Sequence, residues 1–284
     1  MKLKNRIFLE RKLLIATKHQ KESVIAPLFL EEFKNNCFTS KAIDTDLLGT
    51  FSGEIDRKDD ALSTLRKKCI LSNKITNCDL VIASEGSFGA HPSLFFAQAD
   101  EELLMLKDFK NDIEIVAREV SMDTNFNGKS IASEADLLVF AELVNFPSHA
   151  IILKPEEKNF SKIFKGINSM EILLKNYNQL KQEFDSVYAE TDMRAMYNPT
   201  RMNVIKKVTQ KLIEKIKNLC PKCDLPGFDI VIANSGLPCE DCLSATRSTL
   251  SYLYKCKKCC YEKEVLYPRG IRFEDPTYCD NCNP

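Results

Sequence analysis

The sequence predicts an α/β fold, in which a mixed sheet flanked by helices is followed by a helical connector and a small cysteine-rich module. Two observations lead to this prediction. Short apolar runs alternate with helical patterns through the first half of the chain, which is typical of strands and helices packed in layers. Four Cys-x-x-Cys pairs then follow within the last 65 residues. We therefore expect three parts, with boundaries at 1–158, 159–219 and 220–284.

The composition is that of a globular chain with balanced charge. Of 284 residues, 44% are hydrophobic, and 40 Lys and Arg balance 40 Asp and Glu, so no global field draws the chain onto nucleic acid or an anionic membrane. The basic N-terminus fails as a secretory signal because Glu10, Arg11 and Lys12 interrupt the apolar residues behind it. No window reaches the ~18 apolar residues of a membrane span. We expect a soluble, cytoplasmic protein with no membrane partner.

The first half of the chain alternates strand and helix patterns. The predicted elements are strands at 12–16, 37–43 and 80–83, helices at 24–33 and 61–70, and a polar, glycine-containing loop at 44–54. The run Leu80–Ala83 has β-branched residues at its centre and is typical of a buried strand. The alternation favours helices packed against a sheet.

The second half continues with mixed patterns and ends in long helices. The predicted elements are strands at 103–106, 113–117 and 150–153, a turn at 108–112, and helices at 133–143, 163–187 and 198–219. Ser133 with Asp136 forms a capping pair at the start of its helix. Asn198 followed by Pro199 predicts an N-cap with proline in the first helical position.

The cysteine pairs predict metal sites. They are Cys220/Cys223, Cys239/Cys242, Cys256/Cys259 and Cys279/Cys282. Without an export signal, this pattern indicates metal rather than disulfides. Two such turns present four thiolates to one ion, which is the ligand set of a closed, structural zinc site. Eight cysteines therefore predict two zinc ions in a zinc-ribbon module. Redox-active dithiols are the alternative, but four regular pairs exceed what redox chemistry needs.

The sequence leaves the pairing of these turns open. Cys239/Cys242 with Cys256/Cys259 most resembles a zinc ribbon, which would leave the two outer pairs for the second site. Sequential and interleaved pairings are the alternatives. Zinc ribbons often bind nucleic acid, but the tail from Cys220 to Pro284 carries eight Lys and Arg against nine Asp and Glu, a poor footprint for phosphates.

The end of the Leu80–Ala83 strand is the candidate for chemistry. In Ser84-Glu85-Gly86-Ser87-Phe88-Gly89, two glycines within four residues would let the backbone turn sharply and approach a ligand closely. A carboxylate at the carboxyl end of a buried strand stands where open α/β sheets bind ligands. The simpler interpretation is a tight turn with a solvated Glu85.

Further polar residues lie near the ends of the first two strands. The carboxylates Asp44, Asp46 and Glu54 would join Glu85 in holding Mg²⁺, which prefers hard oxygen ligands. The cationic residues are Lys18 and Lys21, which could neutralise a polyphosphate, with Thr17 as a donor. We expect these groups to meet in one cleft. For each single residue, surface solvation is the simpler interpretation.

A resemblance supports this hypothesis. Ala16-Thr17-Lys18-His19-Gln20-Lys21-Glu22 resembles the opening motif of inosine/xanthosine triphosphatases, and Asp79 to Ser87 resembles the strand and acidic-Gly turn of the Maf/ITPase-like group. The resemblance covers roughly residues 12–155 and implies an ITPase-like sheet, a phosphate contact for Lys21 and a metal ligand in Glu85, with Lys67 or Arg66 assisting. The full chain also resembles an uncharacterised bacterial family with a domain of unknown function.

Arg194 and Arg201 lie in a polar segment between two predicted helices and could close over phosphates or a base, or pair with Glu190 and Asp192 instead. We expect a Mg²⁺-dependent hydrolase of a nucleotide or nucleotide-like phosphoanhydride, resembling nucleoside-triphosphate pyrophosphohydrolases. The alternative is a non-catalytic zinc-ribbon protein that binds nucleic acid, a partner protein or a nucleotide signal. Self-association into a homo-oligomer is a further alternative.

Overall fold

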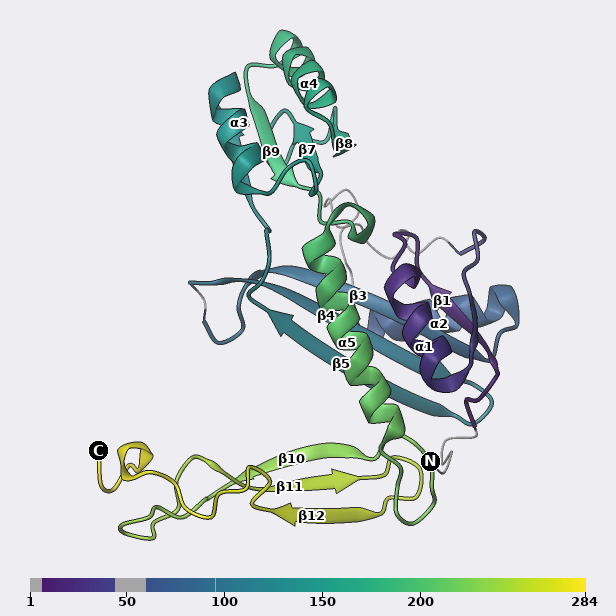
Figure 1. Ribbon diagram of the computed structural model, residues 1–284, viewed down its shortest axis with the longest axis vertical. Helices are drawn as coiled ribbons and strands as arrows, with labels where there is room; N and C mark the ends of the chain where they lie inside the picture. The colour runs from purple at the N-terminus through teal and green to yellow at the C-terminus, as the bar shows by residue number, and fades with distance from the viewer. Residues whose placement is uncertain (1–6, 44–59, 95) are drawn as a thin grey trace. The chain divides into compact units, whose positions relative to one another are not determined.

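The computed structural model of the protein describes residues 7–43, 60–94 and 96–284 (Figure 1). The described chain divides into two compact units, Phe8–Leu212 and a second unit that contains Ile213–Pro284. The predicted loop at 44–54, and with it the candidate ligands Asp44, Asp46 and Glu54, lies outside the described residues.

The first unit contains a mixed five-stranded sheet with the order β2-β1-β3-β4-β5. Its strands are β1 (Lys12–Ala16), β2 (Asn36–Phe38), β3 (Leu80–Ala90), β4 (Gln98–Asp108) and β5 (Ile113–Ser121), and its helices are α1 (Glu22–Phe33) and α2 (Ala61–Thr76). β1 runs parallel to β2 and β3, whereas β4 and β5 are antiparallel to their neighbours. The mixed α/β character predicted from the alternating patterns is confirmed.

Strand β3 is much longer than predicted. It does not turn at Ser84-Glu85-Gly86, because every residue from Leu80 to Ala90 pairs with β4. The glycine at position 86 serves close approach instead of a turn. A Cβ there would come within 2.5 Å of Glu102 Oε1 and 2.6 Å of Arg201 Nη2. A strand glycine of this kind marks a place where other groups press against the backbone.

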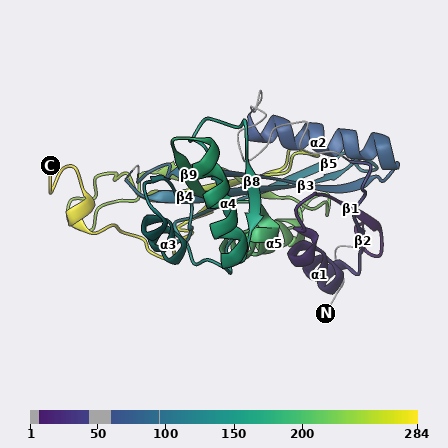
Figure 2. The same cartoon turned by 90° about the horizontal axis from the view of Figure 1, so that it is seen from above.

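The two faces of this sheet are covered by different helices. Figure 2 shows α2 on one face, and α1 with the first part of α5 (Pro199–Lys217) on the other. Side chains of a strand alternate between faces, so the odd-numbered residues of β3 point toward α2. Val81 and Ala83 accordingly pack with Leu65 and Cys69 of α2. Ser84, Gly86 and Phe88 belong to the α1 and α5 face.

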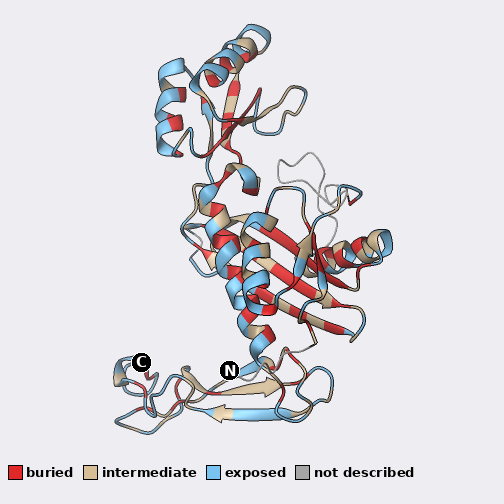
Figure 3. Cartoon of the chain, turned by 45° about the vertical axis from the view of Figure 1, so that its right-hand side comes forward, coloured by how far each residue is buried: buried red, intermediate tan, exposed pale blue. Residues whose placement is uncertain are grey.

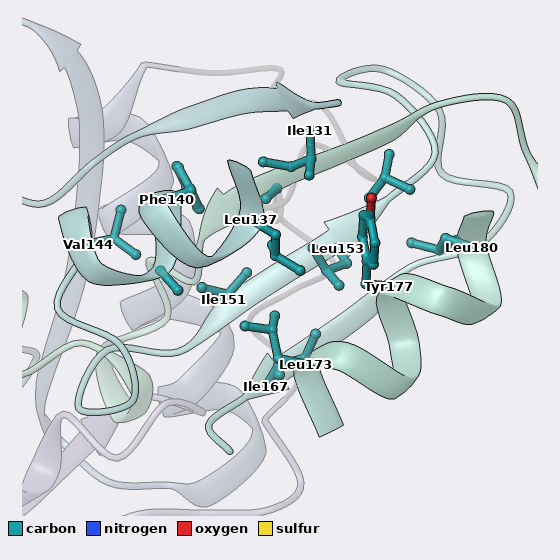
Figure 4. Close-up of a cluster of buried hydrophobic side chains, with 13 residues drawn as sticks. Ile131, Leu137, Phe140, Val144, Ile151, Leu153, Ile167, Leu173, Tyr177 and Leu180 are labelled. Carbon is teal, nitrogen blue, oxygen red and sulfur yellow. The ribbon is translucent and has the colours of Figure 1, made fainter. Parts of the chain in front are cut away.

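A four-stranded sheet with the order β6-β9-β7-β8 also belongs to the first unit. Its elements are β6 (Gly128–Ile131), α3 (Glu134–Leu143), β7 (Ile151–Lys154), β8 (Phe164–Ile167), α4 (Met170–Glu183) and β9 (Val187–Thr191). The N-cap predicted at Ser133 is confirmed, because its side chain accepts a hydrogen bond from the Asp136 N–H. Both helices pack on the sheet through one apolar cluster that includes Phe140, Leu173 and Tyr177 (Figure 4).

The long helix predicted over 163–187 is wrong. Its ends are strands β8 and β9, and only Met170–Glu183 is helical. Gly166 has a left-handed φ of 68°, and Ser169 caps α4 by accepting from the Ile172 N–H. These two residues separate strand from helix although the apolar spacing continues through them. The predicted helical connector therefore contains two strands of the second sheet.

The second unit is small and built on a three-stranded antiparallel sheet, β10 (Asp229–Ser235), β11 (Thr249–Lys255) and β12 (Glu262–Leu266). The short 3-10 helices are η2 (Ala195–Tyr197) in the first unit and η3 (Pro276–Tyr278) here. Burial is concentrated in the strands of the first unit, whereas β10 is largely exposed (Figure 3). The aromatic ring of Phe228 stacks on Tyr254 and Tyr261 beside the first cysteine turns.

Among the described residues, no helix has the length and apolar character needed to cross a membrane.

Candidate functional site

The eight predicted metal ligands converge in two groups of four. The groups are Cys220, Cys223, Cys256 and Cys259, and Cys239, Cys242, Cys279 and Cys282. Within each group all sulfur atoms lie within 4.8 Å of one another, and facing pairs are separated by 3.6 to 3.8 Å. A tetrahedron with Zn–S bonds of about 2.3 Å has edges of about 3.8 Å. A disulfide bond would require a sulfur–sulfur distance of about 2.05 Å. Both groups therefore fit structural zinc sites.

The turns that carry these cysteines are built alike. In each turn the N–H four residues beyond the first cysteine donates to the carbonyl of that cysteine, at Asp224, Leu243, Cys260 and Asn283. The first three of these residues have left-handed φ values of 56°, 60° and 57°. Backbone N–H groups of Lys222 and Cys259 also point at sulfur. Cys260 is thus an exposed residue of the turn and not a ligand.

The pairing is interleaved, so the favoured assignment of Cys239/Cys242 with Cys256/Cys259 is wrong. These two turns flank β11, whose seven residues span about 20 Å. Antiparallel pairing decides which turns meet. Asp229 at the start of β10 lies opposite Lys255 at the end of β11, which brings Cys220/Cys223 next to Cys256/Cys259. The turns Cys239/Cys242 and Cys279/Cys282 meet at the opposite end of the sheet, where Cys239 and Glu274 form an isolated backbone β-bridge.

A second cluster of functional groups lies inside the first unit, on the α1 and α5 face of the large sheet. Lys21 Nζ donates to Ser84 Oγ at 2.8 Å and lies 3.9 Å from Glu102 Oε2. Arg201 Nε donates to Glu102 Oε1 at 2.6 Å. The side chains of Glu102 and Arg201 have no solvent exposure. Asp100, one pleat along β4 from Glu102, is also buried. We call Lys21, Ser84, Asp100, Glu102 and Arg201 the charge cluster.

Glu85 lies outside this cluster, on the other face of β3. Its carboxylate forms an ion pair with Lys68 Nζ of α2 at 2.5 Å, and the same ammonium donates a hydrogen bond to the Ser84 carbonyl at 3.2 Å. Both Glu85 and Lys68 are largely shielded from solvent. Glu85 and Lys21, which we expected to meet in one cleft, therefore lie on opposite faces of β3. Glu85 pairs with Lys68, and Lys21 lies beside Glu102.

Burial sets the protonation of the charge cluster. Burial lowers the pKa of Lys21 to about 7; Glu102 opposes this, and Arg201 and Lys68 add to it. Burial, aided by the negative charge of Glu102, raises the pKa of Asp100 to about 8 against the influence of Arg201 and Lys21. Burial therefore favours the neutral forms of both Asp100 and Lys21 when no ligand is present.

The charge cluster lies beyond the carboxyl end of β1, beside the middle of β3. β1 ends at Ala16, opposite Ala83, so Ser84 extends beyond the end of β1. From β1 the chain crosses to β2 on one side, and from β3 it passes to β4 on the other. In open α/β sheets, ligands bind outside the carboxyl ends of parallel strands whose connections diverge in this way. Lys21 is the N-cap residue of α1, the helix that follows β1.

The remaining predicted site residues lie apart from the charge cluster or at its border. Lys18, Lys67 and Ser87 are exposed, and the Thr17 hydroxyl accepts from the His19 N–H at 3.3 Å. The side chains of Glu102 and Arg201 lie close to the backbone of Gly86. Arg194 forms a double hydrogen bond with Asp192, as the structural interpretation of this segment expected.

Three residues of this region were not predicted: Lys68, Asp100 and Glu102. A signal for the last two was present in the sequence. Asp100 and Glu102 alternate with Glu101 and continue onto the same face as Leu104 and Leu106, which places two carboxylates on an apolar face. An acidic pair in register with core residues indicates a buried polar site.

A known protein family matches most of the chain, including the two tetracysteine groups. Residues 68–284 match the model of a family described as a domain of unknown function, DUF6671. The chain belongs to this family. The DUF6671 match includes β3, β4, α5 and both tetracysteine groups, and it begins at Lys68, after β1 and α1. A search of the curated proteins found no match for this DUF6671 member.

Proposed function

We propose that the protein is a metal-dependent hydrolase of a nucleotide phosphoanhydride, with the charge cluster as its centre. The observation that carries the proposal is the gathering of Asp100, Glu102, Lys21 and Arg201 around Ser84, which lies in the middle of β3 just beyond the carboxyl end of β1. Cations and carboxylates together beyond the end of a parallel strand are the groups that a metal–polyphosphate pair requires. The resemblance of residues 16–22 to the opening motif of inosine/xanthosine triphosphatases supports the same role for Lys21.

The cations of the cluster suit phosphate oxygens. Arg201 presents a planar, permanently charged fork, and Lys21 contributes a point charge that the field of a bound phosphate would keep protonated. Ser84 Oγ, which accepts from Lys21, has a hydroxyl hydrogen that can point to a ligand oxygen. These three groups would hold the phosphate chain and orient its P–O–P linkage toward an attacking water.

The carboxylates suit Mg²⁺. Among the described residues, neither oxygen of Asp100 nor Oε2 of Glu102 has a hydrogen-bond partner, although both side chains are buried. Mg²⁺ commonly takes one or two carboxylates together with substrate phosphates and water. When bound, the ion would neutralise phosphate charge and lower the pKa of a bound water. We assign its ligands to Asp100 and Glu102 because Glu85 is paired with Lys68 on the other face.

We also infer that each tetracysteine group binds one structural zinc ion. Four sulfurs at the spacing of a tetrahedron leave no open position for a substrate, so the ions would stabilise the small second unit rather than act in catalysis. Elemental analysis of the purified chain should find about two zinc ions per chain.

The hydrolase proposal is tested by measuring phosphate and pyrophosphate release from a panel of nucleoside triphosphates, with Mg²⁺ and with a chelator. Asp100→Asn and Glu102→Gln should lose turnover by at least about 100-fold, since both remove a metal ligand. The matched control is Glu101→Gln on the same strand, where the side chain pairs with Arg118 and is partly exposed. It should keep wild-type turnover.

Two outcomes would reject the proposal. One is equal loss of turnover in the Glu101→Gln control. The other is binding of nucleotides with no turnover at any Mg²⁺ concentration, which would favour the nucleotide-sensor alternative. Circular dichroism of each variant separates loss of chemistry from loss of the fold.

A further inference from the structure

A pocket of about 230 Å³ lies within the first unit, bounded by segments from both of its sheets. Three phenylalanines line it from separate parts of the chain: Phe88 of β3, Phe126 before β6, and Phe160 between β7 and β8. The rings of Phe88 and Phe126 stack with centroids 5.7 Å apart and planes inclined by 29°. Aromatic rings brought together from distant segments offer flat apolar walls.

The polar lining of this pocket is balanced in charge. Lys154 is buried, and its Nζ pairs with Glu190 Oε2 at 2.9 Å while lying 4.9 Å above the ring of Phe160. Burial raises the pKa of Glu190. Arg194 and Asp192 neutralise one another through their double hydrogen bond. A pocket with paired charges and aromatic walls has no net attraction for a phosphate and suits a planar, uncharged ring with polar edges.

The pocket and the charge cluster share a wall. The guanidinium of Arg201 lies 5.0 Å from the centroid of the Phe88 ring, and its Nη1 donates to the carbonyl of Met193. Both Phe88 and Met193 line the pocket. Arg201 therefore lies directly behind two residues that line the pocket, and a ligand whose charged part contacts Arg201 would have its neighbouring part beside Phe88 and Met193.

From this arrangement we propose that the pocket binds the base of the nucleotide, stacked against Phe126 and Phe160, with Lys154 and Glu190 bonding its edge. The identification of the ring as a nucleotide base rests on the proposed function. The volume agrees, because pockets that enclose a drug-sized ligand begin at about 300 Å³. A pocket of 230 Å³ takes one ring system and leaves the phosphates to the neighbouring cluster.

The test compares binding of three probes by isothermal titration calorimetry: a nucleoside triphosphate, the corresponding nucleoside, and inorganic triphosphate. Stacking on an aromatic side chain contributes about 1–3 kcal/mol per base, which corresponds to about 5- to 150-fold in affinity. Phe126→Ala and Phe160→Ala should each weaken nucleoside and nucleotide binding by about ten-fold. They should leave inorganic triphosphate binding unchanged.

The control is Phe273→Ala, which removes a half-exposed phenylalanine of the second unit and should change no affinity. Nucleoside binding that survives both pocket variants, or absence of nucleoside and nucleotide binding, overturns the assignment of the pocket. Failure of the proposed hydrolase gives a different result: nucleosides bind and lose affinity in Phe126→Ala, while no nucleotide is turned over. Uniform weakening of all three probes would indicate a structural role for the two phenylalanines and would also overturn the assignment.

Discussion

Arg201 of α5 and Glu102 of β4 are joined by a hydrogen bond of 2.6 Å between side chains that are both fully buried. The two residues are 99 positions apart in the chain. A buried charge is tolerated only with a partner, because its desolvation is costly. This pair therefore links helix α5 to the large sheet at the proposed centre.

Arg201→Met should destabilise the protein by about 3–5 kcal/mol, because it removes the hydrogen-bonded partner of the buried Glu102 and leaves only the Lys21 ammonium, 3.9 Å away. Urea denaturation of the wild type and the variant measures the change. The control on the same helix is Lys211→Met, which breaks a pair with Glu119 whose lysine is half-exposed. Its effect should stay within about 1 kcal/mol. Similar small losses in both variants would contradict the importance of the buried pair.

Gly86→Ala should cost about 1–3 kcal/mol, because the added Cβ would overlap Glu102 Oε1 and Arg201 Nη2. The same change should weaken binding at the charge cluster by moving both side chains. Thermal denaturation and calorimetry measure the two effects. Ser87→Ala, at the next and exposed position of β3, is the control and should stay within about 0.5 kcal/mol of wild type. A fully stable Gly86→Ala protein would contradict the close approach of Glu102 and Arg201 to this position.

The interleaved zinc pairing is testable by metal stoichiometry. The double variant Cys223→Ser with Cys256→Ser removes ligands from one group only and should retain about one zinc ion. Cys223→Ser with Cys242→Ser damages both groups and should retain none. Sequential pairing, or the outer pairing favoured from sequence, predicts loss of both ions in the first variant. Cys260→Ser is the control and should retain both.

His149 should make stability fall in acid. Its ring accepts or donates hydrogen bonds at both nitrogens, to Ser148 Oγ at 3.0 Å and Thr200 Oγ1 at 2.9 Å. Burial lowers the pKa of His149, although the hydrogen bond with the Asn145 backbone acts in the opposite direction. The unfolded chain then binds the proton more readily than the folded chain. The stability that neutral His149 contributes is therefore fully present above a pH of about 6.5 and is lost as the pH falls below it.

His149→Gln should reduce the slope of unfolding free energy against pH below about pH 6.5. Urea denaturation at several pH values gives both slopes. An identical slope in the variant would show that other groups cause the acid sensitivity. A steeper loss in acid for the variant would reverse the assigned direction of the pKa.

Several features of the fold followed from the sequence because their signals are local. Ser133 caps α3 through a hydrogen bond to a residue three positions away, and the strand at Lys12–Ala16 is apolar throughout its centre. The wrong prediction of one helix over 163–187 also came from reading a local signal. Apolar spacing alone did not distinguish α4 from the two strands beside it, whereas Gly166 and Ser169 marked the boundaries.

The sequence by itself determined the eight thiolate ligands, because a Cys-x-x-Cys turn brings two sulfurs together within one short segment. Which turns share an ion was decided by the antiparallel register of β10 and β11, a relation between residues far apart in the chain. Tertiary structure alone likewise joined Glu102 to Arg201 and placed Glu85 on the other face of β3. The physical reason is common to these cases: sheet pairing and burial act through space, so the partners of a buried charge depend on strand register and not on spacing along the chain.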